Sequence, residues 1–149
     1  MKNLILAISL IIAPVLLYGQ NNPQKGATRI ILTDTLNKEQ NFKLIVTKLI
    51  DDGWQIASKD LEYGTIETKP KKFKKDRFET IYNFVVKDFQ VTLSGKLNDN
   101  IDFTYSGVMK INSEWQDIYY SSSLYIFRPA FEKMISFATN LNPSNIEYK

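Results

Sequence analysis

The sequence contains no cysteine and no histidine among its 149 residues. Without cysteine the chain forms no disulfide bond, has no thiolate nucleophile and offers no acceptor for a lipid anchor. Without histidine it has no imidazole base, and the two residue types that bind most transition metals are both missing. These absences exclude catalytic triads with a histidine base and transition-metal sites, and we expect no cofactor.

Charge of one sign and long hydrophobic runs are also scarce. The chain has 19 basic and 16 acidic residues, and the formal net charge of +3 does not by itself indicate an anionic partner. We expect no binding to nucleic acid. One long apolar run, residues 4–18, is shorter than the roughly 20 residues that a membrane-spanning helix needs.

This apolar run is typical of a secretory signal peptide. Lys2 precedes it and the small residue Gly19 follows it, so we expect cleavage after residue 19. An uncleaved N-terminal anchor is the open alternative, which Pro14 disfavours. Cleavage removes one lysine and no acid, lowers the net charge to +2, and predicts a periplasmic or secreted, non-lipidated chain with no stable membrane span.

The rest of the chain is expected to form a flexible leader, residues 20–26, and one domain, residues 27–149. Residues 37–68 indicate how this domain is built. Asn37 and Gln40 match the capping box of a helix, and Gly53 suits the left-handed position that ends one. Between them lies an apolar stripe at helical spacing, formed by Phe42, Ile45, Val46, Leu49 and Ile50.

Alternating or β-branched segments predict strands on either side of this helix. They cover residues 27–33, 54–57, 65–68, 78–86, 89–95 and 101–111. Residues 69–76 are expected to form a basic loop, and residues 112–123 fit either an edge strand or a loop. Short connections between successive strands favour antiparallel pairing.

A second helix is predicted near the C-terminus from an apolar stripe, Ala130, Phe131, Met134, Ile135, Ala138 and Leu141. It begins either at Pro129, a first-turn position, or near residue 122, and it ends before residues 142–143. The fold class is therefore α+β, in the order β-α-β-β-β-β-β-α. We expect one curved, mostly antiparallel sheet of five to seven strands with both helices packed on one face.

Gly53, Trp54 and Ile56, followed by Asp60 and by a second group at Gly64, Thr65, Ile66 and Thr68, form a loose motif. It resembles small exported domains of unknown function from Bacteroidetes-type bacteria, whose fold is similar to half of the TATA-binding protein, a helix-grip arrangement. The same resemblance extends to the repeated domain of a lipoprotein subunit of the outer-membrane barrel-assembly machine. It covers residues 37–111 and implies a fold but no catalytic residues. This chain lacks the lipidated cysteine, so membrane tethering is not implied.

Two segments are candidate partner-binding sites. The first is the basic stretch with Lys71, Lys72, Lys74, Lys75 and Arg77, where clustered cations favour contact with an anionic surface. The alternative is a solvated loop that its lysines keep soluble.

The second candidate segment is aromatic and contains Trp115, Tyr119 and Tyr120. Exposed aromatic rings stack on sugars or anchor protein interfaces. The alternative is that these rings cover the open end of the core.

Close carboxylate pairs occur at residues 51–52, 99–102 and 114–117, but turns and helix ends use aspartate for local hydrogen bonds. The sequence therefore predicts an exported, non-enzymatic binding or interaction module of the bacterial envelope. An accessory subunit of an envelope assembly is one alternative, and a carboxylate-dependent hydrolase is a second. The expected partner is an envelope protein, a glycan or an anionic lipid head group.

Overall fold

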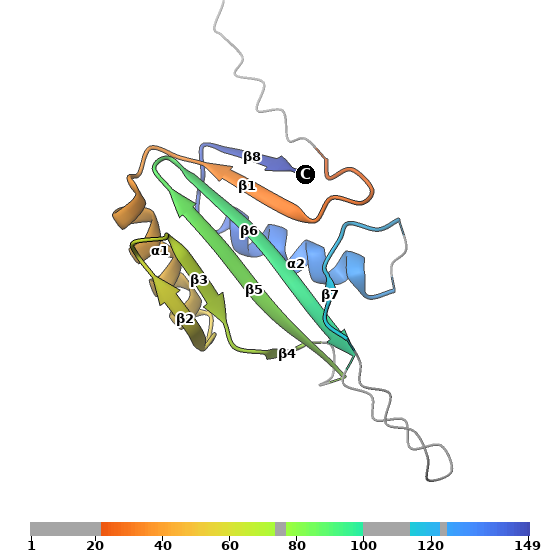
Figure 1. The fold of residues 1–149 in the computed structure, drawn as a ribbon. Coiled ribbons are helices and arrows are strands. Elements are labelled where there is room, and N and C mark those ends of the chain that lie inside the picture. The colour runs from red at the N-terminus through yellow and green to blue at the C-terminus, as the bar shows by residue number, and fades with distance from the viewer. Residues whose placement is uncertain (1–21, 74–76, 100–113, 123–124) are drawn as a thin grey trace, which may run out of the picture.

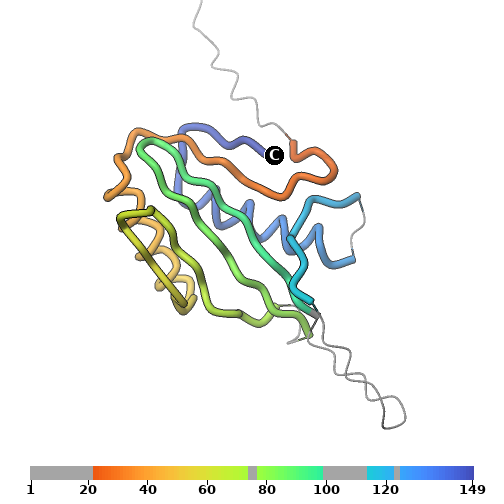
Figure 2. The backbone as a smooth tube through the Cα atoms, in the orientation of Figure 1, coloured from red at the N-terminus to blue at the C-terminus, as the bar shows by residue number. Residues whose placement is uncertain are grey.

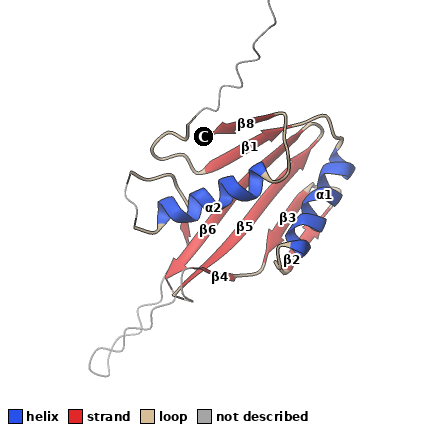
Figure 3. Ribbon diagram, turned by 180° about the vertical axis from the view of Figure 1, so that it is seen from behind, coloured by secondary structure: helices blue, strands red, loops and turns tan. Residues whose placement is uncertain are grey.

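The computed structural model describes residues 22–73, 77–99, 114–122 and 125–149. Together they form an open, curved sheet of eight strands with two helices on one face (Figures 1 and 3). The predicted α+β class and the placement of both helices on one face are confirmed. The elements in chain order are β1 (Arg29–Thr33), α1 (Lys38–Asp51), β2 (Ile56–Asp60), β3 (Thr65–Thr68), β4 (Lys71–Phe73), β5 (Phe78–Lys87), β6 (Gln90–Asp99), β7 (Gln116–Asp117), α2 (Phe127–Thr139) and β8 (Asn145–Tyr148).

The hairpin of β5 and β6 forms the middle of the sheet, as the tube in Figure 2 shows. Six strands follow the order β2-β3-β5-β6-β1-β8, while β4 pairs with β5 and β7 pairs with β6. Each pairing is antiparallel. The pairing of β1 with both β6 and β8 brings the two ends of the domain together in the sheet.

The strand count and order differ from the prediction in two places, because β8 follows the second helix and β4 lies within the predicted basic loop. Strand β7 lies within residues 112–123 and matches the edge-strand alternative. Strand β2 starts at Ile56 and continues to Asp60, beyond the predicted end at residue 57. The predicted strand at residues 101–111 lies outside the described residues.

Helix α1 begins and ends as its sequence predicts. The Asn37 side chain accepts a hydrogen bond from the Gln40 backbone at 3.0 Å, and the Gln40 side chain accepts one from the Asn37 backbone at 3.1 Å. At the other end Gly53 has φ +73°. The Gly53 amide donates to the Ile50 carbonyl and the Trp54 amide donates to the Leu49 carbonyl. These are the two hydrogen bonds of a Schellman motif.

The buried stripe of α1 is rotated relative to the prediction. Ile45 and Leu49 are fully buried, but Ile50 is 59% exposed, so its assignment to the core was wrong. Asn41 is buried on the core side instead. Its amide donates to the Asp34 carboxylate and to the Leu36 carbonyl, which satisfies a polar group inside the core.

Helix α2 begins at Phe127, between the two predicted starts, so Pro129 lies in its first turn as the sequence predicts. Its buried residues are Ala130, Phe131, Met134, Phe137 and Ala138. They pack against alternate residues of β5 and β6, and the other face of the sheet stays open. Among the described residues, no helix combines the length and apolar character needed to cross a membrane.

Candidate functional site

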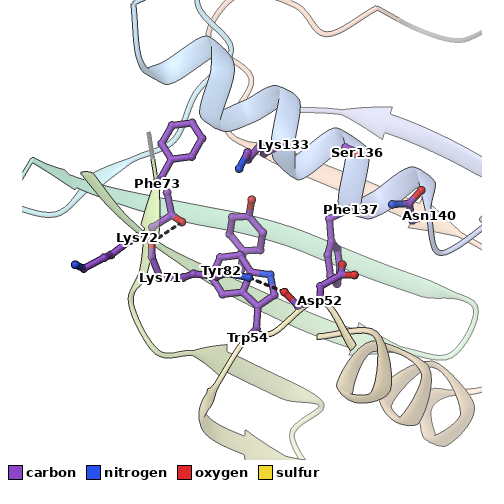
Figure 4. Close-up of a pocket in the computed structure, with 11 residues that line it drawn as sticks. Asp52, Trp54, Lys71, Lys72, Phe73, Tyr82, Lys133, Ser136, Phe137 and Asn140 are labelled. Carbon is purple, nitrogen blue, oxygen red and sulfur yellow. Dashed lines mark hydrogen bonds between the residues drawn. The ribbon is translucent and has the colours of Figure 1, made fainter. Parts of the chain in front are cut away.

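A cleft of about 220 Å³ lies where the C-terminal end of α1, strand β4 and helix α2 meet over β5 (Figure 4). Most of its walls are lysine and aromatic side chains. The lining residues are Asp52, Trp54, Lys71, Lys72, Phe73, Thr80, Tyr82, Lys133, Ser136, Phe137 and Asn140. These residues come from four separate elements, so only the folded chain brings them together.

Lys71 connects β4 to the end of α1. Its ammonium group donates to the backbone carbonyl of Asp52 at 2.6 Å. The negative end of the α1 helix dipole stabilises a cation at this position. The same ammonium nitrogen lies 4.9 Å from the centre of the Trp54 ring, within cation–π range. These two contacts hold the charge of Lys71 at the wall of the cleft.

Lys133 provides a second cation from the opposite wall. Its ammonium nitrogen lies 5.0 Å from the centre of the Phe73 ring. Lys72 borders the cleft on β4, but Figure 4 shows its side chain directed away from the other lining residues. Among the described residues that line the cleft, Asp52 alone carries a carboxylate. Because Lys48 pairs with that carboxylate at 3.0 Å, the cleft keeps a positive potential.

Tyr82 forms the floor of the cleft. Its ring packs 4.4 Å from Trp54 and 6.2 Å from Phe137, centre to centre, and only 3% of the residue is exposed. Figure 4 shows its hydroxyl directed toward the side of the cleft where Lys133 lies. Burial raises the pKa of Tyr82, so the hydroxyl keeps its proton well above neutral pH.

This burial predicts a loss of stability in alkali that depends on Tyr82. Its pKa is raised in the folded state above the ordinary value of 10.0, so the unfolded chain loses the proton first as the pH rises. The contribution of Tyr82 to the free energy of unfolding is intact below pH 10.0 and falls by about 1.4 kcal/mol per pH unit above it. Urea unfolding between about pH 9 and about pH 11 should therefore show a smaller decline in Tyr82→Phe.

Tyr63→Phe is the matched control, because Tyr63 is 75% exposed. The free energy of unfolding of this variant should decline with rising pH as steeply as that of the unmodified chain. An alkaline decline in Tyr82→Phe as steep as in the Tyr63→Phe control would contradict the burial of this phenol.

The predicted basic residues divide between the cleft and its surroundings. Lys71 and Lys72 line the cleft. Arg77 precedes β5, with its guanidinium carbon 5.1 Å from the centre of the Phe78 ring. Lys74 and Lys75 lie outside the described residues.

The predicted aromatic residues pack partly against α2. Tyr119 stacks on Phe127 at 4.4 Å between ring centres and keeps 37% of its surface exposed. Tyr120 meets Phe131 edge to face at 5.8 Å, and the Arg128 guanidinium lies 5.6 Å from its ring centre. Tyr120 thus packs against the core, whereas Tyr119 stays exposed beside α2.

The basic and aromatic segments do not form one site. In the sheet register, Lys71 aligns with Thr80, Thr80 with Leu97, and Leu97 with Gln116. Strands β4 and β7 therefore flank opposite sides of the β5–β6 hairpin, separated by three strand spacings or about 14 Å. Trp115, which is half-buried, directly precedes β7 and so lies across the β5–β6 hairpin from β4.

Two cleft residues that matter most were not predicted from the sequence. Tyr82 belongs to a strand, where alternation predicts only that it is buried, and Lys133 occupies an exposed position of α2. Neither lies in a local motif. The usable signal for Lys133 was its position on α2 at the edge of the apolar stripe, directly before Met134.

The close carboxylate pairs at residues 51–52 and 114–117 show no catalytic arrangement, and residue 102 of the third pair lies outside the described residues. Among the described residues, no aspartate or glutamate is buried, and no group of three or more potential metal ligands of the His, Cys, Asp or Glu type occurs. The carboxylate of Asp52, in the cleft, is engaged by Lys48. The hydrolase alternative thus gains no support from the described residues.

Comparison with known proteins adds no assignment. No protein-family model matches the chain, and no curated protein has significant similarity to it. The resemblance to exported domains with a helix-grip fold stays a prediction.

Proposed function

We propose that the protein is an exported, non-enzymatic binding module of the bacterial envelope, and that its cleft binds an anionic group of the ligand. The observation that carries this proposal is the convergence of Lys71 and Lys133 on one concavity whose carboxylate, Asp52, is already paired. Oppositely charged ligands are attracted to such a site and gain charge-assisted hydrogen bonds there.

The size of the cleft narrows the choice among the expected partners. Its volume of about 220 Å³ is below the range of about 300–1,000 Å³ found for sites that enclose drug-sized ligands. It suits one compact charged group, with the rest of the ligand outside. A lipid head group or a charged end of a glycan meets this condition better than the broad surface of a globular protein.

The accessory-subunit alternative depends on the aromatic segment. Tyr119 is 37% exposed and Tyr125 is 60% exposed, but Tyr120 and Ile118 contribute to the core. A stable protein interface needs a contiguous apolar surface. The described part of the segment offers less support for such an interface than the lysines offer for an anion.

Binding of small anions tests the proposal. The chain without residues 1–19 is titrated at low ionic strength with inorganic phosphate and with acetate by calorimetry. We expect saturable binding of at least one anion, weakened about fivefold in Lys133→Gln because one cationic donor is lost. Added neutral salt should weaken it further.

Lys43→Gln is the matched control, since Lys43 is an exposed lysine of α1 away from the cleft. It should leave the affinity unchanged. If neither anion binds, or if both lysine variants weaken binding equally, the cleft is not the binding site. Lys71 is a poor choice for this test, because its replacement would also remove the cap on α1.

A further inference from the structure

We infer that the cleft selects a phosphate group, and that the hydroxyl of Tyr82 is the hydrogen-bond donor at its floor. This inference rests on the proposed function, because it names the chemical class of the anion and the residue that recognises it. It is carried by the contacts of the aromatic walls, the donors that converge on the cleft and the position of the Tyr82 side chain.

The aromatic walls present cations to the ligand. The ring of Trp54 has the Lys71 ammonium against it at 4.9 Å and Tyr82 at 4.4 Å. The ring of Phe73 has the Lys133 ammonium against it at 5.0 Å. A planar ligand such as a base would have to displace these ammonium groups before it could stack, whereas a compact anion meets them directly.

The donors suit an anion with several oxygen atoms. An ammonium group carries three N–H donors, and Lys71 uses one of them on the Asp52 carbonyl. Lys133 approaches from α2 and Tyr82 from the floor, so donors surround the space from three elements (Figure 4). A phosphate monoester offers three terminal acceptor oxygens and a charge of about −1.5 to −2 at neutral pH, while a carboxylate offers two oxygens and one charge.

Tyr82 is the donor that a purely cationic surface would lack. Its side chain is buried except at the cleft, toward which its hydroxyl points. Burial is the cause of the raised pKa of Tyr82, with no hydrogen bond from a described residue among its causes. A ligand oxygen at this position would satisfy a polar group that the fold leaves facing the cleft.

The chain provides its own optical probe for the test. Trp54 lines the cleft and Trp115 lies beyond the β5–β6 hairpin, so the Trp115→Phe background reports the cleft alone. Fluorescence of Trp54 is followed while inorganic phosphate or acetate is added at equal ionic strength. We expect at least fivefold tighter binding of phosphate than of acetate.

In the same background, Tyr82→Phe should weaken phosphate binding about fivefold and leave acetate nearly unchanged. Tyr63→Phe, at an exposed tyrosine, should change neither. Equal affinity for phosphate and acetate in the unmodified cleft overturns the inference without any variant. The inference is also overturned if the Tyr82→Phe variant keeps the full preference for phosphate over acetate.

The outcomes separate this inference from the function on which it rests. If Lys133→Gln weakens binding of both anions but Tyr82→Phe has no effect, the cleft binds anions and the phosphate assignment is wrong. If no anion binds at all, both fail. If phosphate binds, the source of the phosphate group is tested with vesicles. Binding to vesicles that contain phosphatidic acid, and not to vesicles of phosphatidylcholine alone, indicates a lipid-borne phosphate and not the free ion.

Discussion

Phe131→Ala is expected to lower the free energy of unfolding by about 3–5 kcal/mol. Phe131 is fully buried on α2, and its ring lies 5.8 Å from Tyr120 and 6.3 Å from Tyr148, centre to centre. It therefore links the helix to the aromatic segment and to β8 at once. Truncation would leave a cavity between three elements that are far apart in the sequence and have little means of closing it.

Urea unfolding followed by circular dichroism measures this loss. Phe89→Ala is the matched control, because it removes the same ring from the β5–β6 turn, where Phe89 is 56% exposed. The control should change stability by less than about 0.5 kcal/mol. Similar losses in the two variants would mean that α2 is not anchored to the sheet through Phe131.

Gly64→Ala is expected to lower the free energy of unfolding by about 3 kcal/mol, from a left-handed backbone and a steric clash. Gly64 has φ +68°, and a Cβ atom there would lie 2.2 Å from the carbonyl oxygen of Val86. The two backbones cannot separate freely, because the Val86 amide donates to the Gly64 carbonyl at 2.7 Å. The turn between β2 and β3 would therefore lose its contact with β5.

Gly26→Ala isolates the conformational part of this effect. Gly26 has φ +91°, but nothing lies within 4 Å of a Cβ atom built there. Its loss should be about 1–2 kcal/mol, the cost of the left-handed conformation alone. If thermal or urea unfolding gave equal losses for both glycines, close packing of Gly64 on Val86 would be contradicted.

Local chemistry explains which parts of the fold were predictable. The cap at Asn37 and the stop at Gly53 depend on residues within one or two turns of each other, and both predictions are confirmed. Strand β8 was missed because its stability comes from pairing with β1 at the other end of the chain. Alternation of Ile146 and Tyr148 with polar residues was its only local signal, over four residues.

The candidate site was predictable only in part, for a related reason. A run of lysines is visible in the sequence, and Lys71 and Lys72 do line the cleft. Their partners Tyr82 and Lys133 come from a strand and a helix whose distance from β4 is set by tertiary packing. The sequence also could not indicate that Lys71 has a structural bond to the end of α1, which changes its role from a surface charge to a fixed one.

Nuclear magnetic resonance of the two tryptophan side chains tests the binding of an anion in the cleft most directly. Inorganic phosphate is added to the unmodified chain without residues 1–19, and the indole N–H signals are followed. We predict a saturable shift of the Trp54 signal, because Trp54 lines the cleft, and no comparable shift of Trp115. A stationary Trp54 signal, or a shift confined to Trp115, would contradict the account.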